Sequence, residues 1–150
     1  MKNFLELLGT SIHLPLSLTV RPISNPVPPK CKIFINNKCY FDNILEDTFA
    51  VKENLSLNNP IRITLELTDK QYNENRETAI QIENLKIDNI SLIPIYINYA
   101  VYVNDHNYND PTTYLGFNGV WTLDIQPNFY MWLHRVDGKG WLLDKYSIKE

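Results

Sequence analysis

Cysteine, glycine and histidine are scarce in this sequence, and the few that occur form no catalytic signature. The 150 residues include two cysteines, five glycines and three histidines. There is no glycine-rich phosphate loop, and the histidines are too far apart in sequence to suggest a zinc-protease helix or a serine-histidine-aspartate arrangement. Acidic residues that could pair for glycoside hydrolysis occur in any chain, and only their separation in space decides the mechanism. The sequence therefore predicts a protein that is not an enzyme.

Long hydrophobic runs and an excess of basic charge are also absent. No apolar stretch approaches the roughly 20 residues that span a bilayer, and Glu6, Gly9 and Pro15 interrupt the first apolar run, so it makes a poor signal peptide. The formal net charge is -3, and the 14 Lys and Arg residues are scattered along the chain. Nucleic-acid binding needs a basic patch that neutralises phosphates. We therefore expect neither a membrane nor a nucleic acid as partner.

The two cysteines flank an Asn36-Asn37 pair that is typical of a two-residue hairpin turn. Such a turn places Phe34 opposite Cys39 and Lys32 opposite Phe41, with Cys31 on the other face of the sheet from Cys39. A disulfide does not fit this register. The sequence predicts two free thiols, as in a protein that folds in a reducing cytosol.

Aromatic residues are abundant, with nine Tyr, six Phe and three Trp, and they fall among segments in which apolar and polar residues alternate. Residues 61–68 and 120–125 alternate most clearly, the second with Trp121, Leu123 and Ile125 on one face. Residues 79–88 alternate with a slip near Asn84 that a β-bulge would accommodate. Residues 95–103 predict a long central strand, and the spacing of Phe129, Trp132 and Leu133 predicts a short helical turn after Pro127.

Seven to nine short strands separated by turn residues predict an all-β fold, an antiparallel two-sheet β-sandwich that is jelly-roll-like. Four prolines within residues 22–29 favour extended backbone and oppose pairing in the middle of a sheet. Residues 1–30 are therefore predicted to be an N-terminal arm or linker, and residues 31–150 the sandwich domain. The alternative is that residues 12–20 form the first strand of the domain. The residues predicted to dock the arm on a partner are Phe4, Leu5, Leu7, Leu8, Ile12, Leu14 and Leu16.

Tyrosines beside polar loops form one candidate binding site. Tyr102, Tyr108 and Tyr114 could offer their rings to a sugar or to a protein surface, because tyrosine combines apolar area with a hydroxyl. The loop of residues 104–110 is rich in oxygen ligands of the kind that calcium prefers, although such loops more often cap their own backbone. No resident cofactor is predicted, and calcium is the one candidate metal, with the ligands Asp105, Asn107, Asn109 and Asp110.

Two strings of residues resemble those of small structural proteins of tailed bacteriophages. They are residues 114–121 (Tyr-Leu-Gly-Phe-Asn-Gly-Val-Trp) and 128–133 (Asn-Phe-Tyr-Met-Trp-Leu), preceded by the Ile-x-Ile-x-x-Leu-x-Ile-Asp run at 80–88. The resemblance covers roughly residues 31–133. It implies a β-sandwich like those of carbohydrate-binding modules, and it implies no catalytic residues. The proline-rich segment before Cys31 and the tail with Trp141 depart from the pattern, and either could anchor the chain to other virion proteins.

The resemblance implies a non-enzymatic virion protein, a decoration, fibre or adaptor component that is assembled in the host cytoplasm. Its partners would be other virion proteins and further copies of itself, with a surface glycan as a further candidate. The alternative, from a different class, is a carbohydrate-binding module that uses the three tyrosines, with or without calcium.

Overall fold

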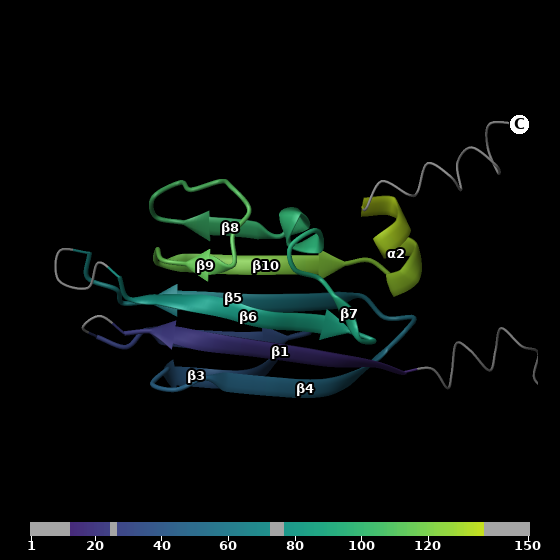
Figure 1. The fold of residues 1–150 in the computed structure, drawn as a ribbon, viewed down its shortest axis with the longest axis horizontal. Coiled ribbons are helices and arrows are strands. Elements are labelled where there is room, and N and C mark those ends of the chain that lie inside the picture. Colours follow the sequence, from purple (N-terminus) through teal and green to yellow (C-terminus); the bar gives the residue numbers. More distant parts are fainter. Residues whose placement is uncertain (1–12, 25–26, 73–76, 137–150) are drawn as a thin grey trace, which may run out of the picture.

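Two antiparallel β-sheets packed face to face form the fold of this protein (Figure 1). The computed structural model describes residues 13–24, 27–72 and 77–136. Each sheet contains five strands, so the predicted two-sheet sandwich is confirmed. In the described ranges, no helix is long and apolar enough to cross a membrane.

The first sheet, sheet A, has the strand order β4-β1-β6-β7, and β9 also pairs with β6. Its strands are β1 (His13–Ile23), β4 (Phe49–Ser56), β6 (Ala79–Ile87), β7 (Ile90–Ser91) and β9 (Tyr114–Leu115).

The second sheet, sheet B, has the strand order β3-β2-β5-β10-β8. Its strands are β2 (Lys30–Ile35), β3 (Lys38–Ile44), β5 (Ile61–Thr68), β8 (Val101–Asn104) and β10 (Gly119–Ile125). A 3-10 helix η1 (Tyr96–Tyr99) precedes β8, and an α-helix α2 (Phe129–Val136) follows β10.

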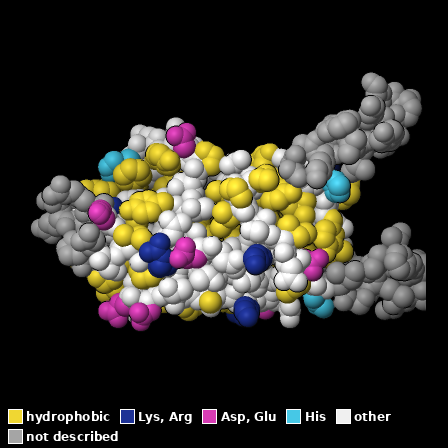
Figure 2. All heavy atoms as spheres, in the orientation of Figure 1, with side chains coloured by type: hydrophobic (Ala, Val, Ile, Leu, Met, Phe, Trp, Pro, Cys, Tyr) yellow, Lys and Arg dark blue, Asp and Glu magenta, His cyan; other side chains and the backbone are white. Residues whose placement is uncertain are grey.

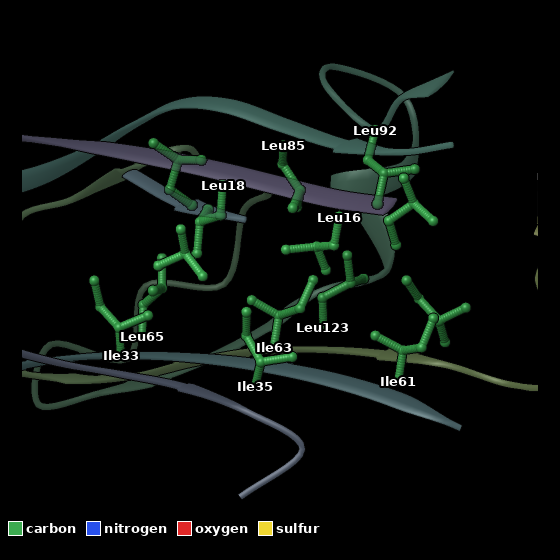
Figure 3. Close-up of a cluster of buried hydrophobic side chains, with 14 of the residues drawn as sticks. Leu16, Leu18, Ile33, Ile35, Ile61, Ile63, Leu65, Leu85, Leu92 and Leu123 are labelled. Carbon is green, nitrogen blue, oxygen red and sulfur yellow. The ribbon is translucent and has the colours of Figure 1, made fainter. Parts of the chain in front are cut away.

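The core lies between the sheets and consists of aliphatic side chains from alternate strand positions. Leu16 and Leu18 point from β1 into this space, toward residues of sheet B such as Ile63 and Leu123 (Figure 3). In β5 every second residue, from Ile61 to Leu67, is at least 98 % buried, as the alternation predicts. The core fixes the register of the strands that bury alternate residues, such as β1, β5 and β10, because a slip of one residue would expose a whole apolar face.

The prediction of an N-terminal arm over residues 1–30 is wrong for the part that forms β1, His13–Ile23, and residues 1–12 lie outside the described residues. Strand β1 lies between β4 and β6 and pairs with both, so the alternative of a first strand is the one that the structure shows. The prolines are tolerated because Pro15 lies in the part of β1 that pairs only with β4, and Pro22 in the part that pairs only with β6. At each proline one edge of the strand needs no donor. The sandwich therefore includes residues before Cys31.

Two of the predicted docking residues are part of the core. Leu14 and Leu16 are 1 % and 2 % exposed, so they are not available to a partner surface. Phe4, Leu5, Leu7, Leu8 and Ile12 lie outside the described residues, and their docking role stays a prediction.

The hairpin between β2 and β3 has the predicted turn. Asn36 and Asn37 have φ angles of 50° and 70°, and Phe34 pairs with Cys39. A register shift after Ile33 then pairs Lys32 with Asp42, so the predicted pairing of Lys32 with Phe41 is wrong. The two thiols are free, with Cys31 buried and Cys39 exposed. Burial, together with the charge of Asp42, raises the pKa of Cys31 to about 12.

The slip predicted near Asn84 is also present. Thr19 of β1 pairs with Asn84, whereas the next residue of β1 pairs with Ile82, so Glu83 is the extra residue of a bulge. The bulge keeps Ile82 and Leu85 both in the core.

Residues 95–103 do not form the predicted central strand. The backbone N–H groups of Tyr96 and Ile97 both donate to the carbonyl oxygen of Leu92, so the chain turns here. The 3-10 helix η1 occupies Tyr96–Tyr99, and the strand β8 begins only at Val101. β8 pairs with β10 alone, and Val101 and Val103 are 61 % and 69 % exposed. The apolar residues of this segment therefore belong to a helical turn and to an exposed edge strand. The sequence pattern alone does not distinguish this arrangement from a strand covered on both faces.

The predicted helical turn is confirmed as α2, which buries Phe129, Trp132 and Leu133. Its Trp132 packs on Tyr96 of η1, with ring centroids 5.8 Å apart. Trp121 of β10 is 1 % exposed. Both tryptophans are thus core residues, as expected for rings that alternate with aliphatic side chains.

The central position of β1 is tested by Leu16→Ala. We expect a loss of about 2 to 5 kcal/mol in the free energy of unfolding, because the substitution leaves a cavity in the core. Thr19→Ala, on the outer face of the same strand, should cost about 1 kcal/mol or less. Chemical denaturation of both variants measures this difference, and equal small losses would argue that β1 is a detachable arm.

Candidate ligand-binding pocket

A hollow of about 510 Å³ lies where β9 and the loop from β8 to β9 meet the segment after β5. This loop and α2 are at opposite ends of the sandwich (Figure 1). The volume is in the range of ordinary small-ligand sites. The residues that line this aromatic pocket are Lys70, Tyr72, Tyr102, Tyr108, Thr112, Tyr114, Gly116 and Phe117.

Asn118 holds together the backbone segments that frame the pocket. Its side chain accepts a hydrogen bond from the backbone N–H of Lys70 (2.8 Å) and donates one to the carbonyl oxygen of the same residue (2.9 Å). Its backbone N–H donates to the hydroxyl of Tyr72 (2.7 Å), and its carbonyl oxygen accepts from the N–H of Asp105 (3.1 Å). One residue therefore joins the segment after β5, the segment after β8 and the start of β10.

Tyr72 forms one wall and is held at both ends. Its hydroxyl donates to Oδ1 of Asp105 at 2.5 Å, and its ring lies 4.4 Å from the ring of His106 in an edge contact. His106 in turn stacks on Phe117, with ring centroids 4.2 Å apart and an interplanar angle of 12°. These contacts fix the orientation of Phe117, which faces the pocket.

Tyr102 and Lys70 form the inner part of the pocket. The hydroxyl of Tyr102 donates to the carbonyl oxygen of Phe117 (2.6 Å) and accepts from its N–H (3.0 Å). Lys70 is only 7 % exposed, and its ammonium donates to the carbonyl oxygen of Gly116 at 2.5 Å. The same ammonium lies 5.4 Å from the centre of the Tyr72 ring, a cation–π distance.

Tyr108 and Tyr114 differ from the other two tyrosines because they are open to solvent. They are 37 % and 42 % exposed. The described residues offer no hydrogen-bond partner to either hydroxyl, whereas the hydroxyls of Tyr72 and Tyr102 are each engaged twice. Tyr108 and Tyr114 are thus the rings that a ligand can reach without breaking an existing contact.

Burial dominates the electrostatics of the pocket. It raises the pKa of Tyr72 to about 12, with a further contribution from the hydrogen bond to Asp105, and it raises the pKa of Tyr102 to about 12. Burial lowers the pKa of Lys70, although the charge of Asp105 opposes this shift. For Asp105 the effect of burial is outweighed by hydrogen bonds from Tyr72 and His106, so its pKa lies below the ordinary value. Tyr72 and Tyr102 therefore keep neutral hydroxyl groups near pH 7.

The loop that carries the four residues predicted as calcium ligands is held by hydrogen bonds of its own, and their role in binding calcium stays a prediction. Asp105 is engaged by Tyr72 and His106, and Asn107 lies in a left-handed turn with φ 54°. Asn104 caps this loop by accepting hydrogen bonds from the backbone N–H groups of His106 and Tyr108. In the part of the chain that the structure describes, no three His, Cys, Asp or Glu side chains form a group that could hold a metal ion. The loop is thus organised by its own backbone, and Asn109 and Asp110 stay exposed.

All three tyrosines predicted as ligand-binding residues line this one pocket; their role in binding stays a prediction. Four further lining residues were not among those predicted for this site: Lys70, Tyr72, Thr112 and Phe117. Lys70 and Tyr72 come directly after the clearest strand of the sequence, but they join the site only through the pairing of β5 with β10. That pairing joins segments about 50 residues apart, and no local pattern reveals it.

No protein-family model matches this chain, and no curated protein matches it. Two solved structures of one carbohydrate-binding module have a similar fold. The structure of vCBM60 in complex with galactobiose has a TM-score of 0.47 and 11% sequence identity, and the match covers 74% of this chain and 99% of that chain. The selenomethionine form of vCBM60, described with two families of calcium-dependent carbohydrate-binding modules, has a TM-score of 0.47 and 10% identity, with coverage of 73% and 89%.

The contacts of Tyr72 predict a pH-dependent stability. Its pKa in the folded protein is about 12, above the ordinary 10.0, so the neutral hydroxyl is the favoured form. Its contribution is fully present below about pH 10 and is lost as the pH rises toward 12, where a phenolate would face Asp105. Tyr72→Phe should be about 1 to 2 kcal/mol less stable than the unmodified protein at pH 8, and the difference should vanish at high pH.

Denaturation curves at a series of pH values measure this effect. Tyr108→Phe is the matched control, since it removes a hydroxyl that has no partner among the described residues, and it should leave the stability unchanged. A Tyr72→Phe protein as stable as the control at pH 8 would show that the network around Asp105 does not support the pocket.

Proposed function

We propose that this protein is a non-catalytic glycan-binding module whose binding site is the aromatic pocket. The proposal rests on the different environments of the four tyrosines that line the pocket, Tyr72, Tyr102, Tyr108 and Tyr114. Two are held by hydrogen bonds and shape the walls, and two present open rings and unpartnered hydroxyls, within the described part of the chain, at the mouth.

The chemistry of the pocket suits a sugar ring. A pyranose has apolar C–H faces and a rim of hydroxyl groups, and tyrosine offers an apolar ring face together with a polar tip. The open rings of Tyr108 and Tyr114 can cover the C–H faces, while their hydroxyls and the ammonium of Lys70 can exchange hydrogen bonds with the sugar rim. A few polar groups in a mostly apolar hollow are the usual composition of a specific small-ligand site.

The fixed wall also favours affinity. Tyr72, His106 and Phe117 are packed against one another before any ligand arrives. Binding would then order few side chains, and a preorganised site loses less conformational entropy on association.

A place on a phage particle, implied by the resemblance of residues 114–121 and 128–133, stays a prediction. A glycan-binding face would suit a component exposed on such a particle.

A glycan array probed with the full-length chain tests the proposal. We expect a restricted set of glycans to bind, and Tyr108→Ala and Tyr114→Ala each to lower the affinity roughly tenfold or more, because truncating an aromatic anchor typically costs about 2 kcal/mol. Tyr130→Ala is the matched control, since this half-exposed tyrosine lies on α2 at the other end of the sandwich.

If no glycan on the array binds the protein, the proposal is wrong. It is also wrong if Tyr108→Ala and Tyr114→Ala both bind glycans with unchanged affinity. A parallel array with a chelator reports on the calcium-assisted alternative, which predicts that binding is lost when the metal is removed.

A further inference from the structure

The outer face of sheet A carries a second hollow, which the aromatic pocket does not use. Its volume is about 490 Å³. It lies across β4, β1 and β6, on the face of the sandwich turned toward the viewer in Figure 2. The residues that line this lysine groove are Pro15, Leu16, Ser17, Lys52, Glu53, Asn54, Asn84, Lys86 and Asn89.

The register of three strands places two lysines symmetrically in the groove. Ser17 of β1 pairs with Lys52 of β4 on one side and with Lys86 of β6 on the other, so the three residues form one row across the sheet. Neighbouring strands lie about 4.8 Å apart, and the Cα atoms of the two lysines are therefore about 9.6 Å apart. Both lysines are exposed, with a hydroxyl-bearing residue between them.

The carboxylates around this row are already engaged elsewhere. Glu53 accepts a hydrogen bond from Tyr40 and pairs with Lys38 of β3. Glu83 pairs with Arg21 at 2.7 Å, and Asp88 accepts a hydrogen bond from Tyr130. In the described ranges, neither Lys52 nor Lys86 has an acidic partner within salt-bridge distance. The groove is thus locally positive on a protein whose formal net charge is -3.

The remaining groups of the groove are amides and a hydroxyl. Asn84 donates a hydrogen bond from Nδ2 to the Oγ of Ser17 at 3.0 Å, which leaves the Ser17 proton available to an acceptor. Asn54 and Asn89 are exposed at the rim. Each of these side chains can donate to or accept from a hydroxyl-rich ligand.

We infer that the lysine groove is a second binding site, which takes a glycan chain that bears carboxylate or sulfate groups. Lys52 and Lys86 would each bind one acidic group, and Ser17, Asn54 and Asn84 the sugar hydroxyls between them. A nucleic acid would need more cations and aromatic stacking surfaces than this row supplies, and a protein interface would need apolar or aromatic anchors that it lacks. The inference does not depend on the aromatic pocket.

Calorimetric titration of the full-length chain with an oligogalacturonate tests this inference. We expect binding that weakens as salt is added, and a loss of roughly tenfold or more in affinity for the double variant Lys52→Gln/Lys86→Gln, because two charge-assisted contacts disappear. Lys32→Gln is the matched control, a lysine of β2 on the other sheet, and it should leave the affinity unchanged. A sulfated oligosaccharide in a parallel titration shows which of the two acidic groups is preferred.

Several outcomes would overturn the inference: no binding of either acidic probe, an equal affinity for the carboxyl-reduced neutral oligosaccharide, or full affinity in the double lysine variant. Tighter binding of an oligothymidylate or of polyglutamate than of both glycan probes would also overturn it, in favour of another class of partner. Tyr108→Ala should bind the acidic glycan normally. A loss in that variant alone would place the acidic glycan in the aromatic pocket, so the failure of this inference is distinguishable from that of the proposed function.

Discussion

The hydrogen bonds of Asn118 are the constraint on which the candidate site depends. Four of them tie the start of β10 to Lys70, Tyr72 and Asp105, which belong to two segments far apart in the sequence. Next to Asn118, a Cβ atom at Gly119 would collide with the backbone of Val103 and Asn104, so only glycine allows β8 to approach β10 this closely. The Asn-Gly pair therefore brings the tyrosines of β8 and of its following loop to the segment after β5.

The sandwich core supplies the rigidity that this arrangement needs. β10 is buried on its inner face through Trp121, Leu123 and Ile125, and it pairs with β5 along its whole length. Its register relative to β5 is therefore fixed by packing, and the position of Asn118 is fixed with it. The site residues that face a ligand can then lie on loops, where side chains are free to vary, while the strands beneath them set the geometry.

The aromatic pocket and the lysine groove differ in the kind of contact on which each depends. The aromatic pocket is built from loops at one end of the sheets and depends on contacts between distant segments. The lysine groove is built from the outer face of three adjacent strands and depends only on register. The first suits recognition of a sugar ring by apolar faces, and the second suits recognition of charge at a fixed spacing.

Local patterns predicted the parts of the structure that local chemistry determines. The alternation of β5 and β10, the turn at Asn36 and Asn37, the bulge beside Asn84 and the helical spacing of α2 could all be recognised in the sequence. The sequence leaves the role of β1 open between an arm and a first strand, because prolines oppose strand pairing in general and are tolerated here only where one neighbouring strand is missing. β8 was misjudged because an exposed edge with Val101 and Val103 has the same composition as a covered strand.

The candidate site shows the same limit. Tyr102, Tyr108 and Tyr114 are close in sequence, so their grouping followed from a single loop. Lys70 and Tyr72 reach them only through the pairing of β5 with β10, which is a property of the whole fold.

Chemical-shift mapping of the ¹⁵N-labelled protein with its best-binding neutral glycan tests the central claim most directly. The account predicts that the largest shifts fall on Tyr108, Thr112, Tyr114 and Gly116, with the opposite end of the sandwich unchanged. Shifts centred on another surface, with these four residues unmoved, would contradict it.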